Sequence, residues 1–160
     1  MVARRLDIAA YHEAGHAVVA RMLGVRVKSV TIQPTLNYSG RVLFDGLGRR
    51  TTEKKILITL AGPHAQRRFA PNSAWRSGNK AHLNSGYDFD NVALLIHDEH
   101  GNGKVADLYW RYVMAKAEQL VEGWWPHIEA VASALLKRET LTGAEMWQAM
   151  CERGKGDQFA

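Results

Sequence analysis

Two histidines and a glutamate near the start of the chain have the spacing of a metal site. His12, Glu13 and His16 form the pattern His-Glu-x-x-His within a segment of helical character. Side chains four residues apart lie on the same face of a helix, so both imidazoles can reach one ion. Imidazoles are common ligands of Zn²⁺, and a carboxylate beside the first ligand can take a proton from a zinc-bound water. These residues therefore predict the first half of a zinc site that hydrolyses peptide bonds.

The surroundings of this short pattern decide how it is interpreted, because it can also arise by chance. If the segment is one helix, His12 and His16 share a side with Val19 and face the core, whereas three alanines lie opposite. A buried imidazole needs partners for its ring nitrogens, and one metal ion supplies a partner for both residues. The alternative is a pair of core histidines that hydrogen-bond to the backbone or to Glu13.

The third ligand of such a site has to come from outside the first helix. A catalytic zinc site has three protein ligands and one open position. The longer form of the motif, which carries a further Gly and His, is absent because Val19 and Met22 stand at those places. Glu53 and Glu99 are candidates by residue type, so the residues alone leave the third ligand open.

The periodicity of the sequence predicts the elements that position these residues. Apolar residues recur at helical spacing over most of the chain, and β-branched residues alternate in two short segments. Pro63 should kink the second helix or start a new one. Segment 71–87, which contains Pro, Asn, Ser and Gly, is predicted to be a long loop. The predicted helices are 4–23, 51–69, 88–100, 105–123, 126–136 and a short one after the capping box at 142–145, and the predicted strands are 25–33 and 41–44.

Length and composition predict one domain over residues 1–160. The periodic segments make this domain mainly α-helical, with a small β-hairpin or sheet after the first helix. The net charge is +5, but Lys and Arg are scattered and no nucleic-acid recognition motif accompanies them, so no nucleic-acid partner is expected. Cys151 is the single cysteine and cannot form an internal disulfide. Since the sequence also lacks a signal-peptide core and a long apolar run, we expect a cytoplasmic protein without a transmembrane segment.

Four blocks of the sequence, in the same order, resemble the peptidase domain of FtsH-type AAA zinc metalloproteases. Together they span nearly the whole chain. The resemblance implies a mostly helical peptidase fold with a small β element, and a zinc ion held by two His and one Asp. The blocks are Tyr11–Ala17, Val30–Pro34, Leu60–Ala65 and Leu135–Glu145.

The resemblance also identifies Asp88 as the third ligand. In the family, this Asp follows a short polar segment and opens a helix with apolar residues one, four, seven and eight positions later. Asp88 fits this pattern and Asp90 does not. The alternative role for Asp88 is that of a helix N-cap, which Asp also favours. His82 and His97 flank this region and remain reserve candidates.

The activity that the resemblance implies is zinc-dependent endopeptidase cleavage of unfolded or extended polypeptides, with Glu13 as general base. The substrate is expected along the edge of the strand that contains Val42. The chain has no phosphate-binding Gly-x-x-x-x-Gly-Lys loop, so unfolding with ATP would need a separate AAA ATPase. The alternatives are a catalytically silent adaptor that binds polypeptide or an AAA partner, and a zinc hydrolase of small amides. The presence of Glu13 argues against the adaptor.

Overall fold

The computed structural model describes residues 5–36, 40–73 and 83–156. This part of the chain is mainly helical and contains a small three-stranded antiparallel sheet, as the sequence predicts. The elements, in chain order, are α1 (Arg5–Met22), β1 (Arg26–Thr31), β2 (Arg41–Asp45), the 3₁₀ helix η1 (Leu47–Arg49), α2 (Thr52–Phe69), α3 (Leu83–His100), α4 (Lys104–Gly123), α5 (Trp125–Arg138), β3 (Thr140–Thr142) and α6 (Gly143–Gly156).

Local signals set several of these boundaries. Gly24 and Gly101 follow α1 and α3 with φ angles of 78° and 67°, a left-handed conformation that glycine adopts without strain. The Thr51 side chain accepts a hydrogen bond from the backbone N–H of Lys54 and caps α2. At α6 the backbone N–H of Thr142 donates to the Glu145 carboxylate, and the backbone N–H of Glu145 donates to the Thr142 hydroxyl. This reciprocal pair is the predicted capping box.

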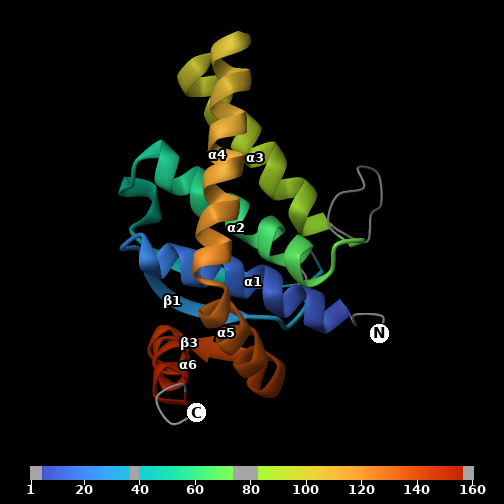
Figure 1. Cartoon of the computed structure of the whole chain (residues 1–160), viewed down its shortest axis with the longest axis vertical. Helices are drawn as coiled ribbons and strands as arrows, with labels where there is room; N and C mark the ends of the chain where they lie inside the picture. The colour runs from blue at the N-terminus through green and yellow to red at the C-terminus, as the bar shows by residue number, and fades with distance from the viewer. Residues whose placement is uncertain (1–4, 37–39, 74–82, 157–160) are drawn as a thin grey trace.

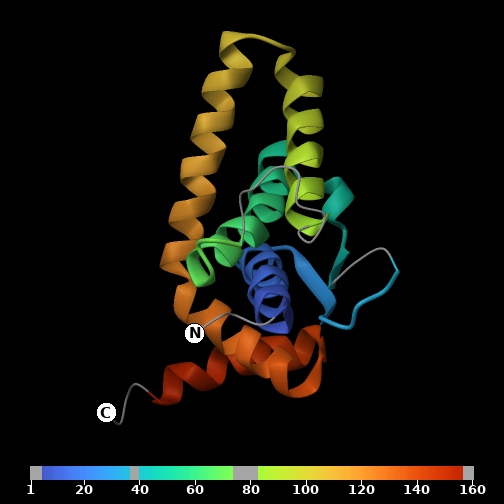
Figure 2. The ribbon, with the colours of Figure 1, turned by 90° about the vertical axis from the view of Figure 1, so that its right-hand side faces the viewer.

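Helix α1 lies at the centre of the molecule, between α2 on one side and α5 with the sheet on the other (Figures 1 and 2). Its sides are buried nearly all round, including Ala10, Ala14 and Ala17, which the helical wheel puts opposite the histidines. A helix surrounded by other elements has no solvent face, and small alanines let those elements approach closely. The two histidines therefore lie on a helix that the whole fold holds in place.

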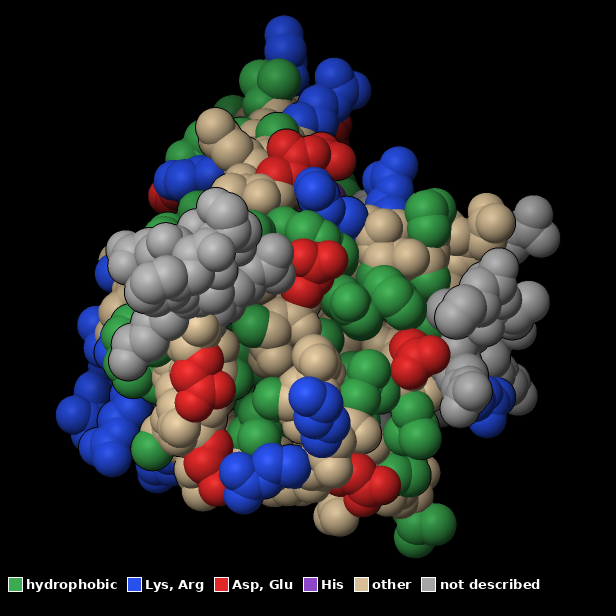
Figure 3. Space-filling view, turned by 60° about the horizontal axis from the view of Figure 1, so that its bottom comes forward, with side chains coloured by type: hydrophobic (Ala, Val, Ile, Leu, Met, Phe, Trp, Pro, Cys, Tyr) green, Lys and Arg blue, Asp and Glu red, His purple; other side chains and the backbone are tan. Residues whose placement is uncertain are grey.

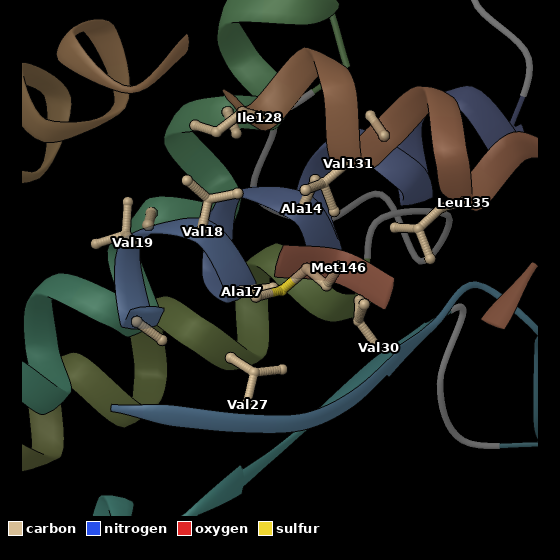
Figure 4. Close-up of a cluster of buried hydrophobic side chains, with 14 of the residues drawn as sticks. Ala14, Ala17, Val18, Val19, Val27, Val30, Ile128, Val131, Leu135 and Met146 are labelled. Carbon is tan, nitrogen blue, oxygen red and sulfur yellow. The ribbon is translucent and has the colours of Figure 1, made fainter. Parts of the chain in front are cut away.

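The main core fills the space around α1 (Figure 4). In β1 the buried residues are Val27 and Val30, three positions apart, because the pairing register shifts between Val27 and Ser29. An irregularity of this kind changes which side chains face the core. The labelled residues come from α1 (Ala14, Ala17, Val18, Val19), β1 (Val27, Val30), α5 (Ile128, Val131, Leu135) and α6 (Met146).

The sheet has the strand order β2-β1-β3, with both pairs antiparallel. Strand β3 was not predicted, because three residues are too few to show an alternating pattern. Its place in the sheet comes from long-range pairing, in which Val30 lies opposite Leu141. Strand β2 is an edge strand of the described sheet, so one of its sides can accept another strand.

Of the two alternatives for α2, a new helical segment at Pro63 is excluded, and the predicted start of α3 needs correction. Helix α2 runs through Pro63 as one element, and Pro63 is buried within it, so the proline does not start a new segment. Pro63 removes one backbone hydrogen bond of the helix, and α2 packs extensively against α1. Helix α3 begins at Leu83, five residues before the predicted start, so residues 83–87 are not part of a loop. Residues 74–82 of the predicted loop lie outside the described part.

Helices α3 and α4 run side by side as a hairpin that extends beyond the rest of the molecule (Figure 2). On the face shown in Figure 3, Lys and Arg side chains lie among Asp and Glu side chains, as expected from charges that are scattered along the sequence. Among the described residues, no helix is both long and apolar enough to cross a membrane.

Gly15 permits the close approach of α1 to α2, and this contact gives a stability prediction. A Cβ atom at Gly15 would lie 2.6 Å from the backbone oxygen of Ala61 and 2.6 Å from the Cβ of Ala65. We expect Gly15→Ala to destabilise the protein by about 1–3 kcal/mol, as overpacking does in well-packed cores. Denaturant unfolding measures the change. Gly123→Ala is the control, because a Cβ there meets no atom within 4 Å; equal stability of the two variants would contradict the packing argument.

Candidate metal centre

Three potential ligand atoms from two helices converge on one point. His12 and His16 of α1 have their Nε2 atoms 3.0 Å apart. The Oδ2 atom of Asp88, on α3, lies 3.1 Å from His12 Nε2 and 3.3 Å from His16 Nε2. The two histidines are buried and Asp88 is half-buried, and within the described residues these three form a group able to hold one metal ion. The structure thus brings together the three residues predicted as ligands.

The other ring nitrogens of the histidines determine what faces the centre. His16 Nδ1 lies 2.8 Å from the backbone oxygen of Ile58, and His12 Nδ1 lies 2.9 Å from Oε1 of Gln66. A carbonyl oxygen only accepts hydrogen bonds, so each Nδ1 is a donor. In the neutral imidazoles, each Nε2 then presents a lone pair to the centre.

With both imidazoles neutral, the centre consists of acceptors that lack a donor. Two Nε2 lone pairs and a carboxylate oxygen face one another, and Asp88 Oδ2 is buried without an aligned hydrogen bond among the described residues. Buried acceptors in contact are unfavourable unless a proton or a metal cation lies between them. This arrangement fits a metal ion, and the sequence prediction of a metal site agrees with it.

Without a metal, a proton on His16 fulfils this role. Burial lowers the pKa of His16, but the Asp88 carboxylate, with smaller contributions from Glu13 and the Ile58 carbonyl, raises it to about 9. Burial raises the pKa of the Asp88 carboxyl group. The charge of His16 and the contacts with both histidines lower this pKa by more, to about 2. The metal-free centre thus holds an ion pair at neutral pH. Because a metal ligand must be deprotonated, metal binding displaces this proton.

Glu13 lies beside the centre and is 3% exposed. Burial raises the pKa of its carboxyl group, against the opposing effect of His12 and His16. A carboxyl group with a raised pKa exchanges protons more readily near neutral pH, as a general base and acid must. The side chain packs against the backbone of Gly40, where a Cβ would lie 2.5 Å from Glu13 Cγ and 2.7 Å from Oε1. Gly40 precedes β2, so the glutamate touches the start of the edge strand.

Gly62 leaves room for the imidazole of His16. A Cβ at Gly62 would lie 2.5 Å from Cε1 and 2.7 Å from Cδ2 of that ring. We expect Gly62→Ala to displace His16 and to weaken zinc binding by about 10- to 100-fold, the range found when support for a metal ligand is lost. Competition with a chelator measures the affinity. Gly48→Ala is the matched control, because a Cβ there meets no atom within 4 Å, and equal affinities of the two variants would show that this contact is unimportant.

The centre opens into a cleft of about 560 Å³. The cleft runs past the edge strand β2, and most of its other wall residues are apolar. Tyr87 lies at the cleft and is largely exposed. The lining residues besides the centre itself and Glu13 are Leu36, Gly40, Arg41, Val42, Phe44, Leu47, Ile58, Thr59 and Tyr87.

The remaining candidate ligands lie elsewhere. Glu53 accepts hydrogen bonds from Tyr112 and Lys116 of α4. Glu99 lies beside His100 near the end of α3, and His97 contacts Asn102 there. None of these belongs to the three-residue group, and His82 lies outside the described residues.

Two features of the centre differ from the sequence-based interpretation. Asp88 is not an N-cap, because α3 begins at Leu83 and places Asp88 in its second turn. Gln66, which holds His12, was not predicted to have any role. No local pattern marks it, because its contact joins residues 54 positions apart in the sequence.

Comparison with known proteins adds no assignment to this geometry: no protein-family model matches the chain, and no curated protein matches it.

Proposed function

We propose that this protein is a zinc-dependent metalloendopeptidase that cleaves unfolded or extended polypeptides. The observation that carries the proposal is the convergence of His12, His16 and Asp88 beside the buried Glu13, at a cleft bordered by an edge strand. Each part of this arrangement has a role in peptide hydrolysis.

The proposed ligand set favours zinc. Two imidazoles and one carboxylate suit Zn²⁺, whereas Mg²⁺ and Ca²⁺ prefer oxygen ligands alone. Three protein ligands leave one position open, which is typical of catalytic rather than structural zinc sites. Zn²⁺, when bound, would make a water molecule more acidic and polarise the substrate carbonyl.

Glu13 would act as the proton carrier. It follows the first ligand directly in α1, and its burial raises the pKa of the carboxyl group. In the proposed reaction, Glu13 accepts a proton from the attacking water and later donates it to the leaving amine. A site that only stabilises the fold has no need of such a group.

The edge strand β2 would bind the substrate. An extended peptide can add to a free strand edge through backbone hydrogen bonds, which need no particular sequence. Arg41, Val42 and Phe44 of β2 line the cleft, and Gly40 touches Glu13. A peptide on this edge would pass near the proposed base. A folded protein would offer no extended segment, so unfolding by a separate AAA ATPase is part of the proposal.

The spatial arrangement of the four sequence blocks supports an FtsH-type peptidase fold. Gly15 of the first block contacts Ala61 and Ala65 of the third. Val30 of the second block pairs with Leu141 of the fourth. The blocks that carry the resemblance therefore contact one another in pairs, the first with the third and the second with the fourth.

The test is hydrolysis by zinc-loaded protein of unfolded casein, of a folded protein and of small amides, with products identified by mass spectrometry. We expect internal cleavage of casein and much slower cleavage of the folded protein. Zinc binding without turnover of any substrate would favour the adaptor, and turnover of small amides alone would contradict the endopeptidase proposal.

A further inference from the structure

We infer that Gln66 is a positioning residue that fixes the tautomer and orientation of His12 for metal binding. The inference deepens the proposed function, since it concerns the same centre, but its main evidence is independent of hydrolysis. Gln66 lies on α2 and is 3% exposed. Its Oε1 atom is 2.9 Å from His12 Nδ1.

The amide of Gln66 is itself held in one orientation. Its Nε2 atom lies 3.5 Å from both the backbone oxygen and the Oγ of Ser73. The Ser73 hydroxyl donates to the backbone oxygen of Ala70 at 2.7 Å, so its lone pairs remain for the amide. The amino end of Gln66 therefore faces Ser73, and its oxygen faces His12. This chain of contacts makes His12 Nδ1 a donor and leaves Nε2 for the metal.

The two histidines differ in the kind of group that accepts the hydrogen bond from Nδ1. His16 donates to the backbone oxygen of Ile58, which α2 fixes in place. His12 instead contacts the side chain of Gln66, whose amide nitrogen faces Ser73. A single residue thus controls one of the two imidazole ligands.

A neutral amide also limits the negative charge near the centre. Glu13 and Asp88 are two carboxyl groups close to the two imidazoles, and both raise the pKa of His16. A carboxylate at position 66 would add a third buried negative charge, which burial disfavours. The amide supplies the acceptor that His12 needs without that charge.

Substitutions at Gln66 separate acceptor chemistry from packing. Gln66→Leu removes the acceptor at similar size, and Gln66→Glu keeps it. We expect Gln66→Leu to weaken zinc binding by about 10- to 100-fold, and Gln66→Glu to restore the affinity to within about tenfold of the wild type, since an acceptor is again present. Ser73→Ala should have a smaller effect than Gln66→Leu, because the Ser73 backbone oxygen remains.

Nitrogen NMR of the His12 ring in metal-free protein provides the direct readout. We expect the proton on Nδ1 in the neutral wild-type ring and in Gln66→Glu, and a shift towards protonated Nε2 in Gln66→Leu. A wild-type His12 with its proton on Nε2 would overturn the inference even if Gln66→Leu failed to fold. Unchanged tautomer and zinc affinity in a folded Gln66→Leu would also overturn it.

The outcomes distinguish this inference from the proposed function. If the tautomer and zinc affinity respond as expected but no peptide is cleaved, the positioning role stands and the peptidase assignment fails. If peptides are cleaved normally by Gln66→Leu with full zinc affinity, the peptidase assignment stands and the positioning role fails.

Discussion

Glu13→Gln should lower kcat for peptide hydrolysis by about 100- to 10,000-fold, the usual contribution of a general acid–base group. The amide has nearly the same size as the carboxyl group but cannot accept the proton from the attacking water. His12, His16 and Asp88 are untouched, so zinc should stay bound. Casein cleavage and zinc content, measured on the same sample, separate these two effects.

Gly40→Ala is a second, independent test of the role of Glu13. The added Cβ would overlap Glu13, so the carboxyl group is displaced without a change in its chemistry. We expect lower hydrolysis with zinc retained, as in Glu13→Gln. Normal cleavage by Glu13→Gln would show that another group carries the proton and would remove the main argument against a silent adaptor.

Asp88→Asn should weaken zinc binding by more than about 100-fold, because a lost ligand has a larger effect than a lost supporting group. The substitution keeps the shape of the side chain and removes its charge. It also removes the largest cause that raises the pKa of His16, so that pKa should fall in the metal-free variant. Chelator competition measures the first effect, and NMR titration of His16 measures the second.

The matched control for this variant is Asp90→Asn. Asp90 lies two residues further along α3, is exposed and is not part of the three-residue group. The Asp90→Asn variant should bind zinc and cleave casein as the wild type does. Wild-type zinc affinity in Asp88→Asn would mean that the third ligand lies elsewhere.

Features with a local cause could be predicted from the sequence. The helical pattern that contains His12 and His16, the glycines that end α1 and α3, and the capping box of α6 depend on residues close in sequence. The two histidines are one helical turn apart, so their convergence follows from helix geometry alone. Asp88 is different, because only the family resemblance placed it near the histidines.

Features that depend on distant contacts could not be predicted. Strand β3 is a strand because β1 lies beside it, and α2 continues through Pro63 because α1 packs along it. The supporting contacts of the centre are of the same kind: Gln66, Gly40 and Gly62 act on residues more than 25 positions away. A single sequence contains no local pattern for such pairs.

The most direct test of the central claim is a zinc titration of metal-free protein with casein cleavage followed at each point. We predict that cleavage rises with bound zinc and reaches a plateau at one zinc per chain, and that Glu13→Gln binds the same amount of zinc without cleavage. Cleavage by the metal-free protein, or no cleavage at full zinc occupancy, would contradict a zinc peptidase built on His12, His16 and Asp88.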